Sequence, residues 1–158
     1  MSLLFRPMDE ANARSMIGWR YDPPYDIYNI PEPAIEDLVF FTDPRNAYYS
    51  IRNDDGTLEA FCCFGADAQV PGGDYAEDAL DVGWGLRPDL VGQGRGAAYV
   101  AAILEFARQT FAPAQFRTTV AEFNIRSRRV CEKAGFQQVQ RFSASTDGMS
   151  FVILTRDA

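Results

Sequence analysis

The alternation of apolar and polar residues divides the chain into short strands and amphipathic helices. Apolar or β-branched runs predict strands, and apolar residues spaced three and four apart predict helices. The predicted strands are residues 2–6, 47–52, 58–64, 79–86, 117–123, 136–142 and 150–155. The predicted helices are residues 10–19, 33–42, 97–111 and 125–134. Over a chain of 158 residues, this series of elements predicts one domain, residues 1–158, with its own hydrophobic core.

Two longer connections interrupt this series. Residues 20–31 contain prolines, which break helices, and the tyrosines Tyr21, Tyr25 and Tyr28. Tyrosines at this density suit contact with a ligand, and packing of the rings over the core is the alternative. Residues 66–78 carry several acids, and we expect them to form a solvated, charged loop.

Composition narrows the chemistry that this chain can perform. The absence of histidine excludes Ser-His and Cys-His nucleophiles and histidine-bound metals. A net charge of −7 disfavours nucleic acid or a membrane surface as partner and suits a cationic partner such as an amine. The cysteines Cys62, Cys63 and Cys131 lack a metal-binding spacing, so we expect reduced thiols. With no long apolar run and no signal-peptide pattern, we expect a cytoplasmic protein.

Three glycines, Gly92, Gly94 and Gly96, occupy alternate positions between a predicted strand and a predicted helix. Because glycine lacks a Cβ atom, the backbone N–H groups of such a loop can turn toward one point without steric penalty. The following helix adds its free N–H groups and the positive end of its dipole. The loop is therefore predicted to bind a phosphate or pyrophosphate, and a tight turn used only for packing is the alternative.

Two common phosphate-binding patterns fit this loop poorly. A P-loop requires Gly-Lys-Ser/Thr after its glycines, and Gly94-Arg95-Gly96 offers neither the lysine nor the hydroxyl. The dinucleotide fingerprint matches Gly92-x-Gly94-x-x-Ala97, but it should open a run of βαβ units. Here it lies past mid-chain, with a hairpin before it and one βα unit after it. A dinucleotide site is therefore the weaker interpretation.

Two motifs resemble the GNAT superfamily of acyl-CoA-dependent N-acyltransferases. The family's loop pattern, Arg/Gln-x-x-Gly-x-Gly/Ala, falls on residues 91–96, where Val91 departs from Arg/Gln. Its second pattern, an asparagine before a helix that ends in Glu-Lys-x-Gly-Phe, is similar to Asn124 followed by Glu-Lys-Ala-Gly-Phe at residues 132–136. Ser127 in this helix resembles a serine of the ribosomal-protein-acetylating branch. The predicted order of strands and helices is also that of the superfamily.

The resemblance implies an α/β (α+β) fold with a mixed, mostly antiparallel central sheet of about six to seven strands and helices on both faces. It implies acetyl-CoA as co-substrate, without a metal, its pantetheine arm held between splayed strands at residues 80–86 and 117–123. Backbone N–H groups of residues 91–97 would hold the pyrophosphate, so the valine is expected to tune binding. The implied cofactor-binding residues are Trp84, Gly85, Leu86, Val91, Gly92, Gln93, Gly94, Arg95, Gly96, Ala97, Asn124, Ser127 and Arg128.

Acetyl transfer requires that the amine loses a proton and that the departing CoA thiolate gains one. Many family members donate this proton from a tyrosine whose position here is Cys131, one turn after Ser127 on the same helix face. Ser127 is the preferred contact to the leaving sulfur, and core packing is the alternative for Cys131. Asp81 and Glu122, one on each splayed strand, are the candidate general bases, acting through ordered water.

Charge is unevenly distributed along the chain, with acids before the glycine loop and basic residues around the second motif. We therefore expect a cationic amine acceptor on one side and the CoA phosphates on the other. Tyr21, Tyr25 and Tyr28 would line the acceptor pocket, because that loop lies on the acceptor side in the family. The predicted activity is N-acetylation of a primary amine of a small molecule or peptide, by a monomer or homodimer. The alternative is a non-catalytic acyl-CoA-binding module.

Overall fold

The computed structural model describes residues 2–158, which form two compact units. The first unit holds the chain up to Cys63 together with Trp84–Val91, and the second holds Phe64–Gly83 and Gly92–Ala158. The helices are α1 (Glu10–Ile17), α2 (Ile35–Thr42), α3 (Gly96–Phe111) and α4 (Ile125–Lys133). The strands are β1 (Leu4–Pro7), β2 (Tyr48–Arg52), β3 (Leu58–Phe64), β4 (Leu80–Leu86), β5 (Gln115–Ala121), β6 (Gln137–Ser143) and β7 (Ser150–Asp157).

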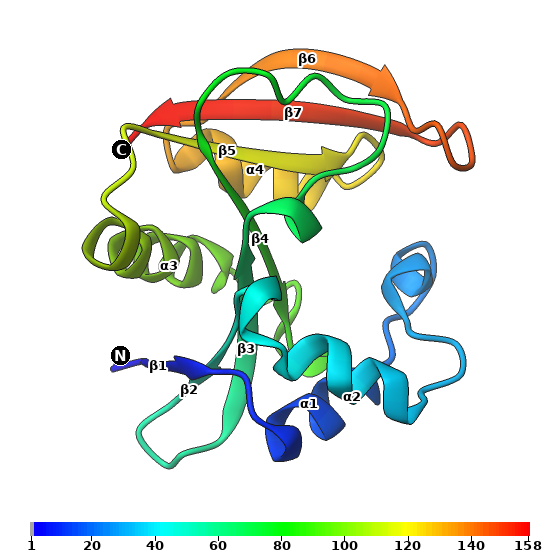
Figure 1. The fold of residues 1–158 in the computed structure, drawn as a ribbon, viewed down its shortest axis with the longest axis vertical. Coiled ribbons are helices and arrows are strands. Elements are labelled where there is room, and N and C mark those ends of the chain that lie inside the picture. Colours follow the sequence, from blue (N-terminus) through cyan, green and yellow to red (C-terminus); the bar gives the residue numbers. More distant parts are fainter. Residues whose placement is uncertain (1) are drawn as a thin grey trace. The chain divides into compact units, whose positions relative to one another are not determined.

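Within residues 2–158 the strands form a seven-stranded sheet in the order β1-β2-β3-β4-β5-β7-β6, labelled in Figure 1. Antiparallel pairing joins β1 to β2, β2 to β3, β5 to β7 and β6 to β7. The pairing of β4 with β5 is parallel. The sheet is therefore mixed and mostly antiparallel, which confirms the predicted fold class.

In the first unit, a capping side chain and a glycine define the two ends of α1. The Asp9 carboxylate accepts a hydrogen bond from the Asn12 N–H at 2.8 Å and so caps the first turn. The helix stops before Gly18, which is its C-cap, and not at residue 19 as predicted. Trp19 therefore lies beyond the helix, and its ring packs 6.2 Å from the ring of Phe61.

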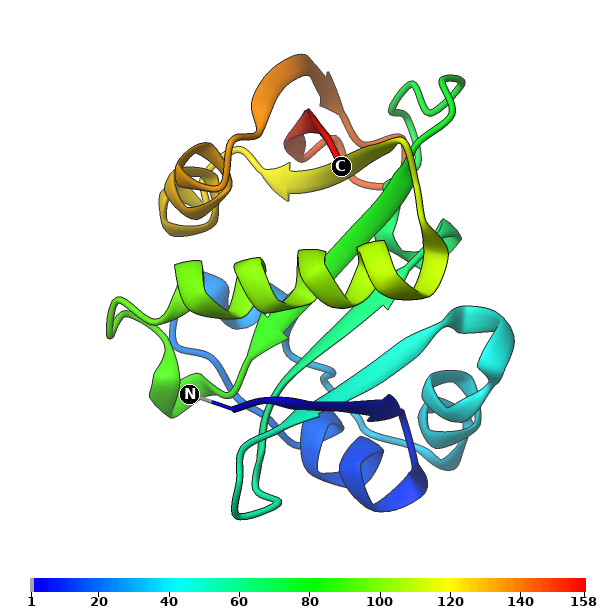
Figure 2. The ribbon, with the colours of Figure 1, turned by 90° about the vertical axis from the view of Figure 1, so that its left-hand side faces the viewer.

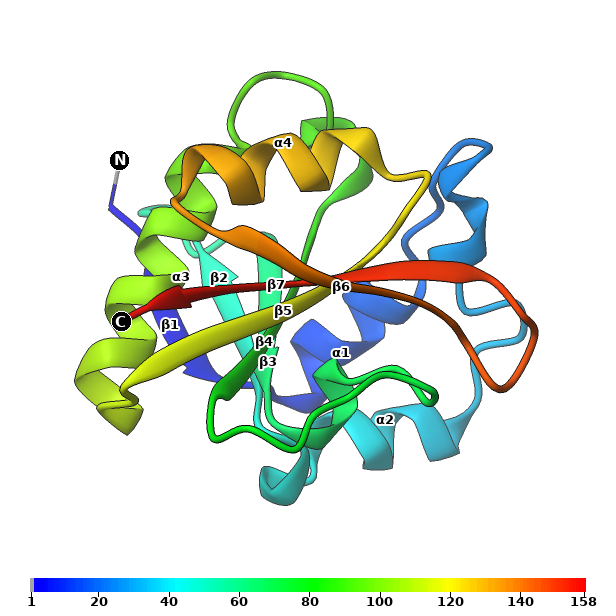
Figure 3. The same ribbon diagram turned by 90° about the horizontal axis from the view of Figure 1, so that it is seen from above.

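In the second unit, β5, β7 and β6 lie side by side, with α4 on one face (Figure 3). Residues 65–79, between β3 and β4, lie on the other face (Figures 1 and 3). This segment is fixed by hydrogen bonds from Ser145 N–H to Pro71 O at 2.9 Å and from Asp74 N–H to Gln140 Oε1 at 3.0 Å. The acids of this segment, Asp67, Asp74, Glu77 and Asp78, are exposed as predicted. The two hydrogen bonds fix its backbone against β6 and the turn that follows β6.

Helix α3 buries the apolar stripe that its sequence predicts, and α4 lies near its N-terminal half (Figure 2). The buried residues of α3 are Tyr99, Val100, Ile103, Leu104 and Ala107.

Strand β5 begins and ends two residues earlier than predicted, since the Asn124 N–H donates to Ala121 O at 2.9 Å in a turn that leads into α4. None of the helices in residues 2–158 is both long and apolar enough to span a membrane.

Candidate active site

The glycine loop between β4 and α3 has a left-handed backbone at two positions. Gly92 has φ +78° and Gly94 has φ +74°, a region that favours glycine. Helix α3 begins at Gly96, and its N-cap residue, Arg95, makes no side-chain capping hydrogen bond. Because the first N–H groups of a helix lack intrahelical acceptors, this end of α3 presents donors and a positive dipole. Such a loop can bind an anion through its backbone.

Helix α4, which carries the second motif, lies against this loop. The Asn124 Oδ1 accepts a hydrogen bond from the Ser127 N–H at 3.1 Å, and this confirms the predicted N-cap. Packing between the two motifs is close, because a Cβ atom on Gly96 would lie 3.1 Å from Cγ2 of Val130. The two motifs, separated in sequence, therefore meet in the second unit.

The two candidate acids lie one turn apart on α4 but in different surroundings. Ser127 is partly exposed, whereas Cys131 is 0% exposed. Burial raises the pKa of the Cys131 thiol to about 12. A thiol with no exposed surface cannot reach a bound substrate, which favours a packing role for Cys131. Ser127 stays the candidate contact to the leaving sulfur, because its side chain is partly exposed.

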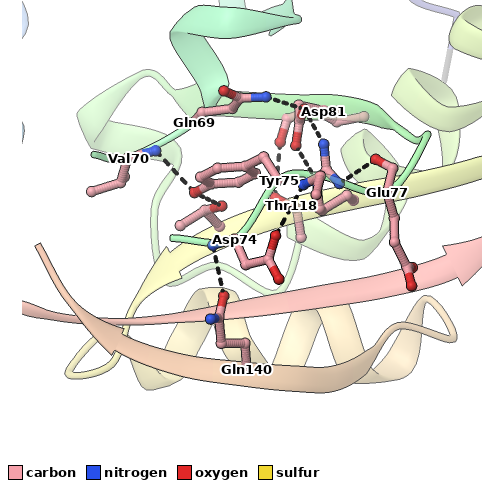
Figure 4. Close-up of polar contacts among 12 residues, drawn as sticks. Gln69, Val70, Asp74, Tyr75, Glu77, Asp81, Thr118 and Gln140 are labelled. Carbon is pink, nitrogen blue, oxygen red and sulfur yellow. Dashed lines mark hydrogen bonds and ion pairs between the residues drawn. The ribbon is translucent and has the colours of Figure 1, made fainter. Parts of the chain in front are cut away.

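Asp81 is held in a buried ion pair with Arg117 (Figure 4). Its Oδ1 accepts from Arg117 Nε at 2.6 Å, and its Oδ2 accepts from Arg117 Nη2 at 2.8 Å. Gln69 Nε2 also donates to Oδ2 at 2.8 Å (Figure 4). The hydrogen bonds that Arg117 donates to Asp81 raise the pKa of the Arg117 guanidinium. Both carboxylate oxygens of Asp81 accept hydrogen bonds, and the residue is only 3% exposed. These two features favour a structural role for Asp81 over the predicted role as general base.

Tyr75 completes this buried network. Its ring covers the Arg117 guanidinium, 4.9 Å from the ring centroid, and its hydroxyl accepts from the Val70 N–H at 2.9 Å. Asp81 and Arg117 are also register partners in the short parallel ladder between β4 and β5. The ion pair therefore joins β4 to β5 at the end of this ladder. Arg117 is therefore buried and engaged within the second unit.

Glu122, the second candidate base, follows β5 and is more accessible than Asp81. It forms an ion pair with Arg141, and 34% of its side chain is exposed. Arg128, predicted to bind the cofactor, donates from Nη1 to the carbonyl oxygen of Glu122 at 3.0 Å. Glu122 therefore stays the better placed base candidate, while part of the Arg128 guanidinium is engaged by the end of β5.

In the first unit, the tyrosine-rich segment is tied to the end of β4 by Tyr21. The Tyr21 hydroxyl donates to Leu86 O at 2.6 Å, and the Tyr21 N–H donates to Asn29 Oδ1 at 2.7 Å. Burial raises the pKa of the Tyr21 hydroxyl. Tyr25 and Tyr28 begin and end a short 3₁₀ helix, and Tyr28 is 44% exposed. Tyr25 and Tyr28 are thus better placed than Tyr21 for contact with an acceptor.

Tyr21→Phe is expected to lower the free energy of unfolding by about 1–3 kcal/mol, because it leaves the Leu86 carbonyl without its partly buried donor. Urea unfolding of the two proteins measures this difference. A change below about 0.5 kcal/mol, the usual range for an ordinary surface substitution, would contradict the anchoring role of Tyr21.

The end of β4 in the first unit contains Trp84, Gly85 and Leu86, all partly exposed. A Cβ atom on Gly85 would lie 2.4 Å from the ring of Phe61, so this glycine allows β4 to approach β3. The next residue after the strand, Arg87, donates its N–H to Glu59 O at 2.8 Å.

Comparison with known families identifies the fold and both motifs together. The family model of the acetyltransferase (GNAT) domain matches residues 2–137. The chain belongs to the GNAT acetyltransferase family. The match includes the glycine loop and α4 of this GNAT protein. A comparison of the whole chain with curated protein sequences finds no match.

Solved structures with the same fold cover almost the whole of this GNAT chain. A GNAT-family acetyltransferase from Bacillus anthracis is 18% identical, with a TM-score of 0.75 and coverage of 99% of this chain and 95% of the other. The spermidine N-acetyltransferase from Vibrio cholerae with CoA and spermine is 12% identical, with a TM-score of 0.75 and coverage of 98% and 95%. The aminoglycoside acetyltransferase AAC(6')-Ib with paromomycin and acetyl-CoA is 16% identical, with a TM-score of 0.76 and coverage of 99% and 94%. These similarities concern the fold.

Proposed function

We propose that the protein transfers the acetyl group of acetyl-CoA to a primary amine of a small molecule or peptide, by direct attack in a ternary complex. The observation that carries this proposal is the left-handed glycine loop at the start of α3, in a chain of the GNAT family. A cationic acceptor is supported by the net charge of −7 and by similar structures whose proteins bind spermine or paromomycin.

The cofactor would be held mainly by the backbone. N–H groups of residues 91–97 would bind the pyrophosphate, and the polar backbone groups of Trp84 and Gly85 would pair with the pantetheine arm. The carbonyl of Leu86 already accepts the Tyr21 hydroxyl, so it contributes less to this pairing than its neighbours. Proximity of the two bound substrates supplies much of the rate acceleration in such a mechanism.

Proton transfer would use Ser127 and Glu122. As the amine nitrogen attacks the thioester carbon and the C–S bond breaks, Glu122 would accept the amine proton through water. Ser127 would supply a proton to the thiolate, directly or through water, as in the ribosomal-protein-acetylating branch that this helix resembles. Partial exposure of both side chains supports these roles.

Ser127→Ala is expected to lower kcat about 100-fold with little change in the Kd of acetyl-CoA, because it removes a proton donor and leaves the loop intact. Cys131→Ala, on the same helix face, is the matched comparison and should retain most of kcat while lowering stability. Steady-state kinetics with calorimetric binding separates the two effects. Equal kcat for Ser127→Ala and wild type, or a 100-fold loss in Cys131→Ala, would reverse the assignment.

The buried Cys131 thiol also predicts a pH dependence of stability. Its pKa is raised in the folded protein, so the folded state keeps a proton that the unfolded state loses above its ordinary pKa of about 8.5. Stability should therefore be unaffected by this group below that pH and fall above it, by up to about 1.4 kcal/mol per pH unit. Urea unfolding between neutral and alkaline pH should show a shallower decline for Cys131→Ala. The same slope in both proteins would contradict the burial argument.

The same proposal includes the predictions of domain organisation, oligomeric state, localisation and metal content. Residues 1–158 would work as one acetyltransferase domain, as a monomer or homodimer in the cytoplasm, without a metal. The agreement of the family model over most of the chain supports the single functional domain.

The proposal is tested by incubating wild type with acetyl-CoA and a panel of amines. The panel holds a polyamine, an aminoglycoside, an amino acid and a peptide with a free N-terminus. The proposal predicts that at least one amine raises the release of CoA thiol and gains one acetyl group by mass spectrometry. Binding of acetyl-CoA without acetylation of any amine would favour the acyl-CoA-binding module.

A further inference from the structure

Positive charge accumulates at the glycine loop without acidic residues in either adjoining helix end. Neither α3 nor α4 has an acid in its first turn, although both begin beside the loop. Residues 126, 128 and 129 of α4 are all arginine, in a chain whose net charge is −7. A cation in the first turn of a helix opposes the helix dipole. This arrangement therefore lowers the stability of α4 unless an anion lies close by.

The arginines near the loop point in different directions. The Arg95 guanidinium lies over the ring of Tyr99, 5.3 Å from its centroid, one turn further along α3. Arg128 donates to the carbonyl oxygen of Glu122. Arg126 is placed at the loop itself, because a Cβ atom on Gly92 would lie 3.5 Å from both Cζ and Nη1 of its guanidinium.

We propose that Arg126 binds the pyrophosphate of the cofactor, together with the backbone N–H groups of the glycine loop. The inference rests on the proposed function. A guanidinium presents several N–H donors in one plane, which suits two oxygens of a phosphate group, and such charge-assisted bonds are stronger than neutral ones. The loop side chains bring one cation, Arg95, and Arg126 adds the second at the left-handed turn.

Arg126→Gln tests the proposal, since glutamine keeps a polar side chain and removes the charge. Calorimetry should show about 10-fold weaker binding of acetyl-CoA, of CoA and of dephospho-CoA, which keeps the pyrophosphate but lacks the 3′-phosphate. The melting temperature without ligand should change little, because Arg126 is exposed. A purely structural arginine would instead lower the melting temperature.

Arg129→Gln is the matched control, because Arg129 is an exposed arginine of the same helix. It should change the Kd of each ligand less than about 2-fold, as expected of an exposed charge that contacts no phosphate. An equal loss in Arg129→Gln, unchanged binding in Arg126→Gln, or a loss confined to ligands with the 3′-phosphate would overturn the assignment. Failure of wild type to bind acetyl-CoA at all would instead reject the proposed function on which the inference rests.

Discussion

Asp81→Asn is expected to lower the free energy of unfolding by about 3–5 kcal/mol, the largest effect on stability that we predict. The substitution leaves the Arg117 guanidinium buried without its counter-ion, at 4% exposure and beneath the ring of Tyr75. It also weakens the junction between β4 and β5, where Asp81 and Arg117 are register partners. Urea unfolding measures the loss.

Glu105→Gln provides the control for this prediction, because it breaks an exposed ion pair with Arg108 on α3. Its expected change is below about 1 kcal/mol. The pH profile of kcat/KM adds a functional reading, since Asp81→Asn should keep the shape of the profile and Glu122→Gln should alter it. Wild-type stability in Asp81→Asn, or loss of the acidic limb of its pH profile, would contradict the structural role.

Gly94→Val is expected to weaken acetyl-CoA binding by about 100-fold or more, the largest effect on affinity. A β-branched residue is strained at φ +74°, so the loop must leave the left-handed region and turn its N–H groups away from the anion. Loss of two charge-assisted hydrogen bonds is sufficient for an effect of about this size. Calorimetric titration with acetyl-CoA measures it.

Gly148→Val separates binding from backbone strain. Gly148 lies in the turn between β6 and β7 with φ +77°, and a Cβ atom at either glycine has no neighbour within 4 Å. The two variants should therefore lose similar stability, while only Gly94→Val loses affinity. Equal affinity in the two variants would mean that the glycine loop does not hold the cofactor.

Much of the fold could be predicted from the sequence because its signals are local. Asp9, Asn124 and the apolar stripe of α3 define helices through contacts within a few residues. The contacts that fix residues 65–79 could not be predicted, because their partners on β6 and in the following turn are more than sixty residues away. The exposure of the acids in this segment follows from their charge, whereas its backbone contacts depend on residues distant in the sequence.

The candidate site was predictable where function depends on backbone and glycine, and less so where it depends on side-chain partners. The loop and the cap at Asn124 follow from motifs, whereas the Asp81–Arg117 pair joins residues 36 apart through a parallel ladder. Tyr21 likewise finds its acceptor at Leu86. The proposed role of Arg126 could not be predicted from the sequence, because the rotation of α4 about its axis decides which arginine lies at Gly92. The sequence signal for it is a run of arginines at a helix N-terminus.

Thermal unfolding of wild type with acetyl-CoA, CoA, NAD and NADPH, each in excess, tests most directly whether the glycine loop is a CoA site. A ligand at about 100 times its Kd should add about 2.7 kcal/mol of stability and raise the midpoint clearly. The account predicts this shift with acetyl-CoA and CoA and no shift with either dinucleotide. A shift with NAD or NADPH alone would contradict it and support the dinucleotide interpretation of Gly92-x-Gly94-x-x-Ala97.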